Sequence, residues 1–320
     1  MADAAIIYNT ETPFTHDAAD IIVRSMSDNV DFPVQKAFLA AASVVFQDMF
    51  SLPQNESHIG SGFSAGNMKN GLHIMTLDED EETLGTLLRM CYPRWMVIDC
   101  EPLFPTLEHT LAVFTAAKKY AMDGVEREVR AVLVAPRFIE QNPLRAFALV
   151  MRDNLYDEAK TCARYTLRTP ILSKVYMPEL EYITAGAYYR LQKYHVLCGI
   201  AAEGVSQDLR WITNESGTWF ECALCRGNSV VGISGDRRKW VAKWWADFMV
   251  EAKNALRERP CGATVGIGSE VVQMAIEKAN VCVTCRSKVF REMFQFCTLF
   301  SAEVEKAIDT VEVEFGAPLG

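Results

Sequence analysis

The chain contains 320 residues, of which 50% are hydrophobic and 23% are charged. These proportions are typical of soluble globular proteins, and at about 150 residues per domain the length predicts two or three domains. The formal net charge of −9 excludes a general attraction to nucleic acid or to anionic membranes. No apolar stretch approaches the roughly 18 residues of a membrane span, and the N-terminus has no secretion-signal pattern. We therefore expect an intracellular protein, cytoplasmic or nuclear, with reduced thiols and no membrane partner.

Charge is distributed unevenly along the chain. Residues 1–135 hold 9 Lys and Arg against 19 Asp and Glu, whereas residues 136–320 hold 23 against 22. This difference favours separate domains in the two halves.

The first third of the chain combines strand and helix patterns. Residues 19–24 and 30–34 are predicted strands joined by a turn at Ser27–Asn29, so they form a hairpin. Helices follow around Leu39 and Phe46, and Ser43 is the predicted N-cap of the second one. A polar, glycine-rich loop covers residues 51–71.

A further strand and three helices follow this loop. Residues 72–77 alternate as in a strand, and the acidic run at residues 78–82 is expected to begin the next helix, because carboxylates suit a helix N-terminus. An acidic docking patch is the alternative for that run. Helical spacing returns at residues 107–120 and 122–133. The fold class is therefore α+β, with a mostly α-helical region after it.

The order and the residues of this region resemble the BTB/POZ family. The resemblance is carried by Asp20 and the strand after it, by Phe32-Pro33-Val34, by the helix pair with Leu39, Ser43, Phe46 and Met49-Phe50, and by the stretches GLHIMTLDED and FTAAKKYAMDGVEREV. It covers residues 15–135, after a flexible N-terminus at residues 1–14, and implies a short mixed sheet flanked by helices that binds proteins.

Two departures from the family bear on the partners. Gln35 stands where the family usually has His, and only about 18 residues precede the first strand, so the usual homodimer is not assumed. A short exchanged strand at Ala5–Tyr8 is the alternative that would restore it.

Residues 136–204 form a predicted helical extension. Asn142-Pro143 is a predicted cap followed by proline at the first helical position, a second helix covers residues 155–167, and Pro178 begins a third. By position and helical pattern this extension is similar to the BACK region of adaptor proteins.

Two Cys-x-x-Cys pairs stand out in the last predicted domain, residues 205–316. Four thiolates, from Cys222, Cys225, Cys282 and Cys285, would complete the tetrahedral shell of one structural Zn²⁺ per chain. Fifty-six residues separate the pairs, more than in compact zinc modules, so the ion would hold two distant segments together. Buried free thiols and redox chemistry are the alternatives. Cys198, Cys261, Cys297 and His195 are expected to be core residues.

The same domain contains a basic and aromatic segment. Trp240, Trp244 and Phe248 are spaced four apart, which predicts one helix with its aromatic side toward the core and a solvated basic face. Contact with nucleic acid is the alternative for Arg237–Lys239. Ser269 and Ser301 are the predicted N-caps of two later helices. Together with the Cys pairs, this arrangement resembles BTB proteins of basidiomycete fungi.

No assembled catalytic motif was found. A single Gly-x-Ser-x-Gly, at Gly62–Gly66, lacks the strand and helix of a nucleophile elbow, and the five His residues form no pattern for acid–base chemistry. We therefore expect a non-enzymatic BTB scaffold that self-associates or binds a cullin as a substrate adaptor of a ubiquitin ligase. The alternative is a zinc-containing nucleic-acid-binding or transcriptional regulator.

Overall fold

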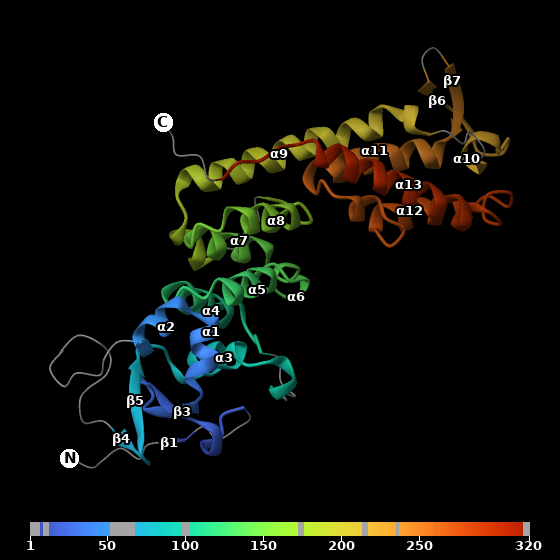
Figure 1. The fold of residues 1–320 in the computed structure, drawn as a ribbon. Helices are drawn as coiled ribbons and strands as arrows, with labels where there is room; N and C mark the ends of the chain where they lie inside the picture. The colour runs from blue at the N-terminus through green and yellow to red at the C-terminus, as the bar shows by residue number, and fades with distance from the viewer. Residues whose placement is uncertain are drawn as a thin grey trace. The chain divides into compact units, whose positions relative to one another are not determined.

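The computed structural model describes residues 7–8, 13–51, 68–97, 103–171, 176–212, 217–234 and 237–315. The chain divides into two compact units, Met1–Phe138 and Ile139–Gly320 (Figure 1). Within the described residues, no helix is both long enough and apolar enough to cross a membrane.

A five-stranded mixed sheet organises the first unit. Strands β2 and β3 form the predicted antiparallel hairpin, and β5 pairs in parallel with β2. Asn29 takes the left-handed conformation (φ 57°) in the hairpin turn, which Asn tolerates better than most residues. The order in the sheet is β1-β3-β2-β5-β4, with β1 at Ile7–Tyr8, β2 at Ile21–Ser25, β3 at Val30–Val34, β4 at Met68–Lys69 and β5 at Leu72–Leu77.

The helices of the first unit follow the predicted pattern, and Figure 1 shows α4 packed against α3 and α5. Short 3-10 helices lie at His16–Ala18 (η1) and Arg94–Met96 (η2). The α-helices are α1 (Lys36–Ala42), α2 (Val44–Ser51), α3 (Glu81–Cys91), α4 (Leu107–Lys119) and α5 (Asp123–Leu133).

Two polar side chains fix the ends of these helices. The Ser43 hydroxyl accepts the Phe46 N–H at 3.0 Å and donates to the Tyr120 carbonyl at 2.6 Å, so it caps α2 and ties it to the end of α4. Asp80 accepts the Thr83 N–H at 2.7 Å at the start of α3. The acidic run therefore begins a helix, as predicted.

Two described parts of the chain before β2 pack in the first unit. Ile7–Tyr8 pairs in parallel with β3 of the same chain, and Phe14 is fully buried with its ring edge-on to Phe32 at 5.3 Å. The predicted flexible N-terminus at residues 1–14 therefore contributes a strand and a core residue to the first unit.

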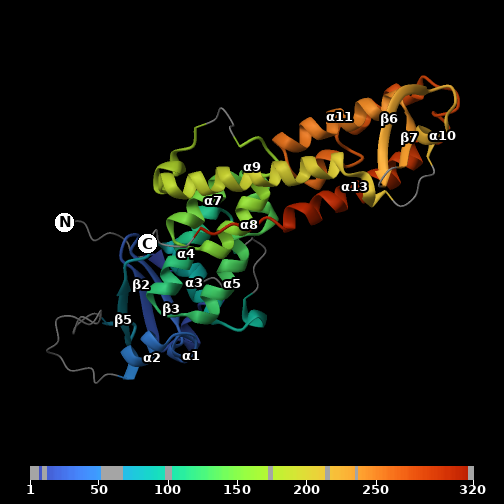
Figure 2. The ribbon, with the colours of Figure 1, turned by 90° about the horizontal axis from the view of Figure 1, so that it is seen from above.

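The second unit is mostly helical. Helix α9 packs against α11 and α13, and Figure 2 shows the C-terminal part of α9 between these two helices. The chain enters this unit through α6 (Pro136–Ile139). Its other elements are α7 (Pro143–Arg152), α8 (Tyr156–Thr166), η3 (Pro178–Tyr182), α9 (Ala185–Gln207), η4 (Leu209–Trp211), α10 (Thr218–Glu221), β6 (Arg226–Ser234), β7 (Arg237–Ala242), α11 (Lys243–Glu258), η5 (Gly262–Val265), α12 (Glu270–Asn280) and α13 (Val289–Asp309).

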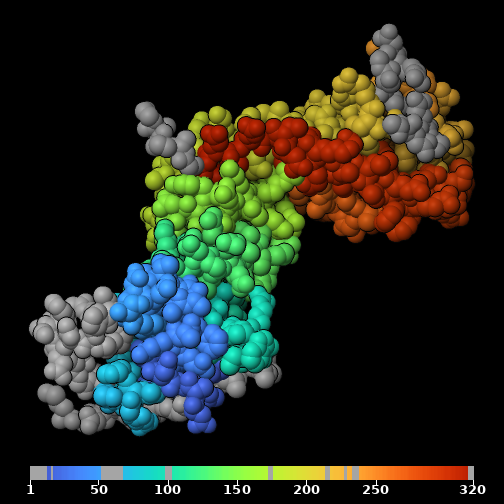
Figure 3. Space-filling view, viewed as in Figure 1, coloured from blue at the N-terminus to red at the C-terminus, as the bar shows by residue number. Residues whose placement is uncertain are grey.

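The C-terminal segment closes this unit. After α13, the chain continues to Phe315, which is buried and whose ring lies 5.0 Å from that of Phe147 in α7. Figure 3 shows this segment in red along the surface of the unit.

The predicted helix boundaries are partly reproduced. The Asn142 side chain accepts the Arg145 N–H, so the cap of α7 is as expected. Pro178 begins a 3-10 helix, and α9 begins later, at Ala185, with Thr184 as its cap. The expected domain boundary between residues 204 and 205 falls inside α9, and residues 139–320 form one compact unit.

Three details of the last predicted domain differ from the sequence expectation. Residues 226–242 form a β-hairpin, so Trp240 belongs to a strand and only Trp244 and Phe248 lie on the helix. Helix α13 runs through Ser301, whose hydroxyl donates to the Gly262 carbonyl at 2.8 Å instead of capping a helix. Ser269 precedes α12 without a side-chain cap hydrogen bond.

Candidate metal centre

The four cysteines of the two Cys-x-x-Cys pairs meet in the second unit. The sulfur atoms of Cys222, Cys225, Cys282 and Cys285 all lie within 4.8 Å of one another. The Sγ atoms of Cys222 and Cys282 are 3.7 Å apart, and those of Cys225 and Cys285 are also 3.7 Å apart. Among the described residues this is the one group of three or more ligand-type side chains so arranged.

The first pair lies between a helix and a strand. Cys222 follows α10, and its N–H donates to the Thr218 carbonyl at 3.0 Å. Cys225 immediately precedes β6, and its carbonyl accepts the Lys243 N–H at 3.3 Å, where β7 passes into α11. The turn carrying these two thiols is thus fixed at the base of the hairpin.

The second pair lies in the turn between α12 and α13. The Cys282 N–H donates to the Ala279 carbonyl at 3.1 Å, and the Cys285 carbonyl accepts the Val289 N–H at 2.8 Å. Cys282 therefore follows the C-terminal end of α12, and Cys285 precedes the N-terminal end of α13. Both helices have a buried apolar face. The helices bring the second pair to the first across a long stretch of sequence.

The sulfur separations match a tetrahedral metal shell. Zn–S bonds of about 2.3 Å at tetrahedral angles give sulfur–sulfur distances of about 3.8 Å. The measured 3.7 Å is also far longer than the roughly 2.05 Å of a disulfide bond. Four thiols held at this spacing can bind one ion and leave it no open coordination position.

The thiols have different proton affinities. Burial raises the pKa of Cys225 to about 11 and also raises the pKa of Cys285, which is completely buried. A hydrogen bond from the Cys285 N–H lowers the pKa of Cys282 to about 6. Of these three thiols Cys282 loses its proton most readily, and a divalent ion would supply the charge that ionises Cys225 and Cys285.

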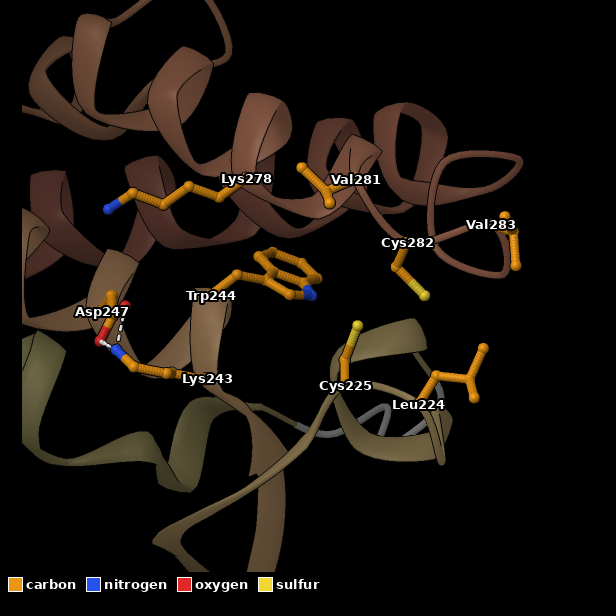
Figure 4. A pocket seen from close by; sticks show the side chains of 9 residues that line it. All are labelled: Leu224, Cys225, Lys243, Trp244, Asp247, Lys278, Val281, Cys282 and Val283. Atoms are coloured by element: carbon orange, nitrogen blue, oxygen red, sulfur yellow. Dashed lines mark hydrogen bonds and ion pairs between the residues drawn. The ribbon is translucent and has the colours of Figure 1, made fainter.

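The indole N–H of Trp244 is placed to donate a hydrogen bond to a metal-bound thiolate. Its Nε1–H is buried and has no hydrogen-bond partner among the described residues, and Figure 4 shows this nitrogen on the ring edge facing Cys225 and Cys282. Trp219 and Trp245 also have buried indole N–H groups that find no partner in the part of the chain that the structure describes. A buried donor without an acceptor is costly, and thiolate sulfur on an ion would accept from Trp244.

Aromatic side chains support the centre from the core side. The rings of Trp219 and Trp245 stack with a 9° interplanar angle at 6.1 Å, and Phe296 meets both edge-on. The outer side is a pocket of about 580 Å³ lined by Leu224, Cys225, Lys243, Trp244, Asp247, Lys278, Val281, Cys282 and Val283 (Figure 4). Cys225 and Cys282 therefore lie at the pocket, whereas Cys222 and Cys285 are buried.

The remaining candidates lie elsewhere. Cys198, Cys261 and Cys297 are buried outside the cluster, as expected of core residues. Burial lowers the pKa of His195, whose Nε2 lies 3.1 Å from the Thr169 carbonyl, so this side chain is also part of the core. The Gly-x-Ser-x-Gly sequence at residues 62–66 lies outside the described residues.

Sequence reasoning missed two features near the centre, namely the β6–β7 hairpin and the position of Trp244 beside the sulfur atoms. The dipeptide Gly235-Asp236, a two-residue turn signal between the two segments, was the available signal for the hairpin. The contact of Trp244 had no signal in the sequence, because it depends on how α11 packs.

Comparison with known proteins identifies the first unit. The family model of the BTB/POZ domain matches residues 12–136. A search of the curated proteins finds no match to the chain, so the resemblance of residues 205–316 to fungal BTB proteins stays a prediction. The mixed sheet and helices of the first unit and the family match agree, and residues 12–136 are a BTB/POZ domain.

Proposed function

We propose that this protein is a non-enzymatic scaffold in which the BTB/POZ domain binds a protein partner and a zinc-bound helical unit presents a second binding surface. The observation that carries this proposal is the BTB/POZ domain itself, because such domains mediate protein–protein contacts and self-association. The second compact unit gives the chain a separate place for another partner.

Zinc has a structural role in this proposal. The four ligands are Cys222, Cys225, Cys282 and Cys285, one ion is bound per chain, and a shell of four thiolates leaves no position for substrate or water. The ion would join the base of the β6–β7 hairpin to the α12–α13 turn. Removing it would release two segments that are 56 residues apart in the sequence.

The partner of the BTB/POZ domain that we propose is a cullin, with the helical unit receiving the protein to be ubiquitinated. The support for this arrangement is the order of the chain, in which a helical region directly follows the BTB/POZ domain. Self-association through the same domain would produce a bivalent receptor.

Co-purification of the tagged full-length protein, with mass spectrometry of the bound proteins, tests this proposal. Large apolar side chains are exposed on the BTB/POZ domain at Met26, Val44 and Trp95. Replacing each by Glu in a separate variant should remove the cullin, or the second copy, for at least one position. Val250→Glu, at an exposed position of α11 in the second unit, is the matched control and should retain it.

The outcome also separates the classes of function. Recovery of a cullin that depends on the BTB/POZ surface supports the adaptor. Recovery of chromatin or transcription proteins without a cullin contradicts the adaptor and favours a regulator. Partners that none of the three substitutions affects contradict binding through these parts of the domain.

A further inference from the structure

One face of the β6–β7 hairpin carries an unusual set of exposed side chains. We call it the Arg–Trp face, and it consists of Arg226, Val230, Arg238 and Trp240. Val230 pairs with Trp240 across the two strands. These two apolar side chains remain 43% and 45% exposed, respectively, and Arg226 and Arg238 are exposed beside them.

The alternation of side chains along β7 fixes which residues point outward. Val241 is buried, and the Lys239 ammonium lies 5.0 Å from the centre of the Phe220 ring, so these two residues face the core. Arg238 and Trp240 therefore point to the opposite side. A Cβ added on that side at Gly232, which pairs with Arg238, would meet no atom of the described residues within 4 Å.

Trp240 contrasts with the tryptophans that follow it. Trp244 and Trp245 are buried in the aromatic core, whereas Trp240 presents its ring to solvent with the Arg226 guanidinium 5.7 Å from its centre. An exposed indole beside arginines is a surface on which a planar, electron-rich group can stack. The next outward side chain along the strand is Arg238, two residues or about 7 Å away.

The charge of this segment favours a polyanion as the ligand. Residues 226–243 contain five Lys and Arg and one Asp, although the whole chain has a net charge of −9. Lys243 pairs with Asp247 at 2.7 Å. Neither Arg226 nor Arg238 pairs with a carboxylate in the part of the chain that the structure describes, so both guanidinium groups can contact phosphate.

We propose that the Arg–Trp face binds single-stranded nucleic acid. One base stacks on Trp240, and Arg226 and Arg238 contact the phosphates on either side of it. Unstacked bases fit this face better than a duplex, whose bases already stack on one another. This site goes beyond the proposed scaffold function and does not depend on the partner of the BTB/POZ domain.

The hairpin is attached directly to the candidate metal centre, since Cys225 and Arg226 are neighbours and the Cys225 carbonyl accepts the Lys243 N–H. The ion should therefore hold the Arg–Trp face in place. Removing it should weaken nucleic-acid binding even though no ligand of the ion lies on that face.

The test is fluorescence anisotropy of the zinc-loaded full-length protein with fluorescein-labelled dT12 and rU12. We expect binding at 50 mM salt that weakens steeply by 200 mM. Trp240→Ala should weaken it about 10-fold, and Trp240→Phe should retain most of it. Charge reversal at Arg226 and Arg238 should abolish binding at 200 mM salt and reduce the salt slope by about 2.

Matched controls keep the result specific. Trp95→Ala removes an exposed tryptophan from the other unit, and Lys160→Glu with Lys306→Glu makes the same charge change elsewhere. These variants should bind like the wild type. Unchanged zinc content and melting would show that every variant is folded.

Four results would overturn the proposal. They are no binding at 50 mM salt, equal binding by the wild type and the variants of the Arg–Trp face, tighter binding of a duplex of the same length, and displacement of the oligonucleotide by an equal charge of polyglutamate. The last result would assign the face to an acidic protein partner instead.

Discussion

Two antiparallel hairpins of the molecule, β2–β3 and β6–β7, are held in different ways. The hairpin β2–β3 lies inside a five-stranded sheet, and all but one of its ten residues are buried. The hairpin β6–β7 forms a two-stranded sheet that exposes one face. A two-stranded sheet is marginally stable by itself. Apolar burial therefore secures the first hairpin, whereas the second depends on its packing against α10 and α11 and on the proposed ion at its base.

This difference predicts that loss of the ion affects only the second unit. Cys285→Ser removes a completely buried ligand and should reduce zinc from one ion per chain to none. Structural zinc stabilises small modules by about 10 kcal/mol or more, so this is the largest expected effect. Hydrogen exchange should become fast in residues 217–242 and stay slow in β2 and β3.

Cys261→Ser is the control for this substitution. Cys261 is buried outside the cluster, and its sulfur contacts the Thr264 hydroxyl at 3.3 Å, a contact that serine can keep. This variant should retain one zinc per chain. Full zinc content in Cys285→Ser would show that the metal is not held as proposed.

A substitution in the first unit should destabilise that unit and leave the second unit unchanged. Ser43→Ala removes the cap of α2 and leaves the buried Tyr120 carbonyl without the Ser43 hydroxyl. The expected cost is about 2 kcal/mol, measured by urea unfolding and by hydrogen exchange in α2, with zinc content unchanged. Ser51→Ala, at an exposed position of the same helix, should cost far less. Equal costs would contradict the role of the cap.

A smaller effect is expected from Trp244, which is not a ligand of the proposed ion but lies beside two of its ligands. Trp244→Phe keeps an aromatic ring and removes the Nε1–H that faces Cys225 and Cys282. We expect zinc affinity to fall about 10-fold, as when a group behind a metal ligand is lost. Competition with a chelator measures it, and Trp240→Phe is the control. Unchanged affinity would mean that the indole N–H does not serve the metal centre.

The smallest effect concerns acid stability within the second unit. Because burial lowers the pKa of His195 below 6.5, the unfolded chain binds the proton more readily and stability falls as the pH drops below about 6.5. One proton gives a slope of at most about 1.4 kcal/mol per pH unit. His195→Gln should reduce this slope between pH 5 and 7, whereas His73→Gln, at an exposed position, should not. An unchanged slope in His195→Gln would contradict this account.

Periodicity was sufficient to predict the first unit. Hydrophobic residues form a continuous run in β2, alternate in β5 and recur at helical spacing in α4 and α5, and Ser43 and Asp80 stand at the helix starts as caps. Each local signal agrees with the tertiary structure there, so the α+β class and the BTB/POZ resemblance were confirmed. The strand at Ile7–Tyr8 was only an alternative in the sequence analysis, because a two-residue strand has no detectable period.

The second unit shows where local patterns mislead. Trp240, Trp244 and Phe248 have the spacing of one helix, but a strand ends at Ala242 and the helix begins at Lys243. A serine inside α13 looks like a cap, although the apolar stripe of Cys297, Phe300 and Val304 continues across it. The convergence of the cysteines was predicted from the spacing within each pair, while the helix packing that joins the pairs had no sequence signal.

The most direct test of the metal centre is zinc X-ray absorption spectroscopy on full-length protein purified under reducing conditions, with the metal quantified on the same sample. The account predicts one zinc per chain surrounded by four sulfur atoms at about 2.3 Å. Protein that folds without zinc, or a first shell that contains nitrogen, oxygen or fewer than four sulfur atoms, would contradict it.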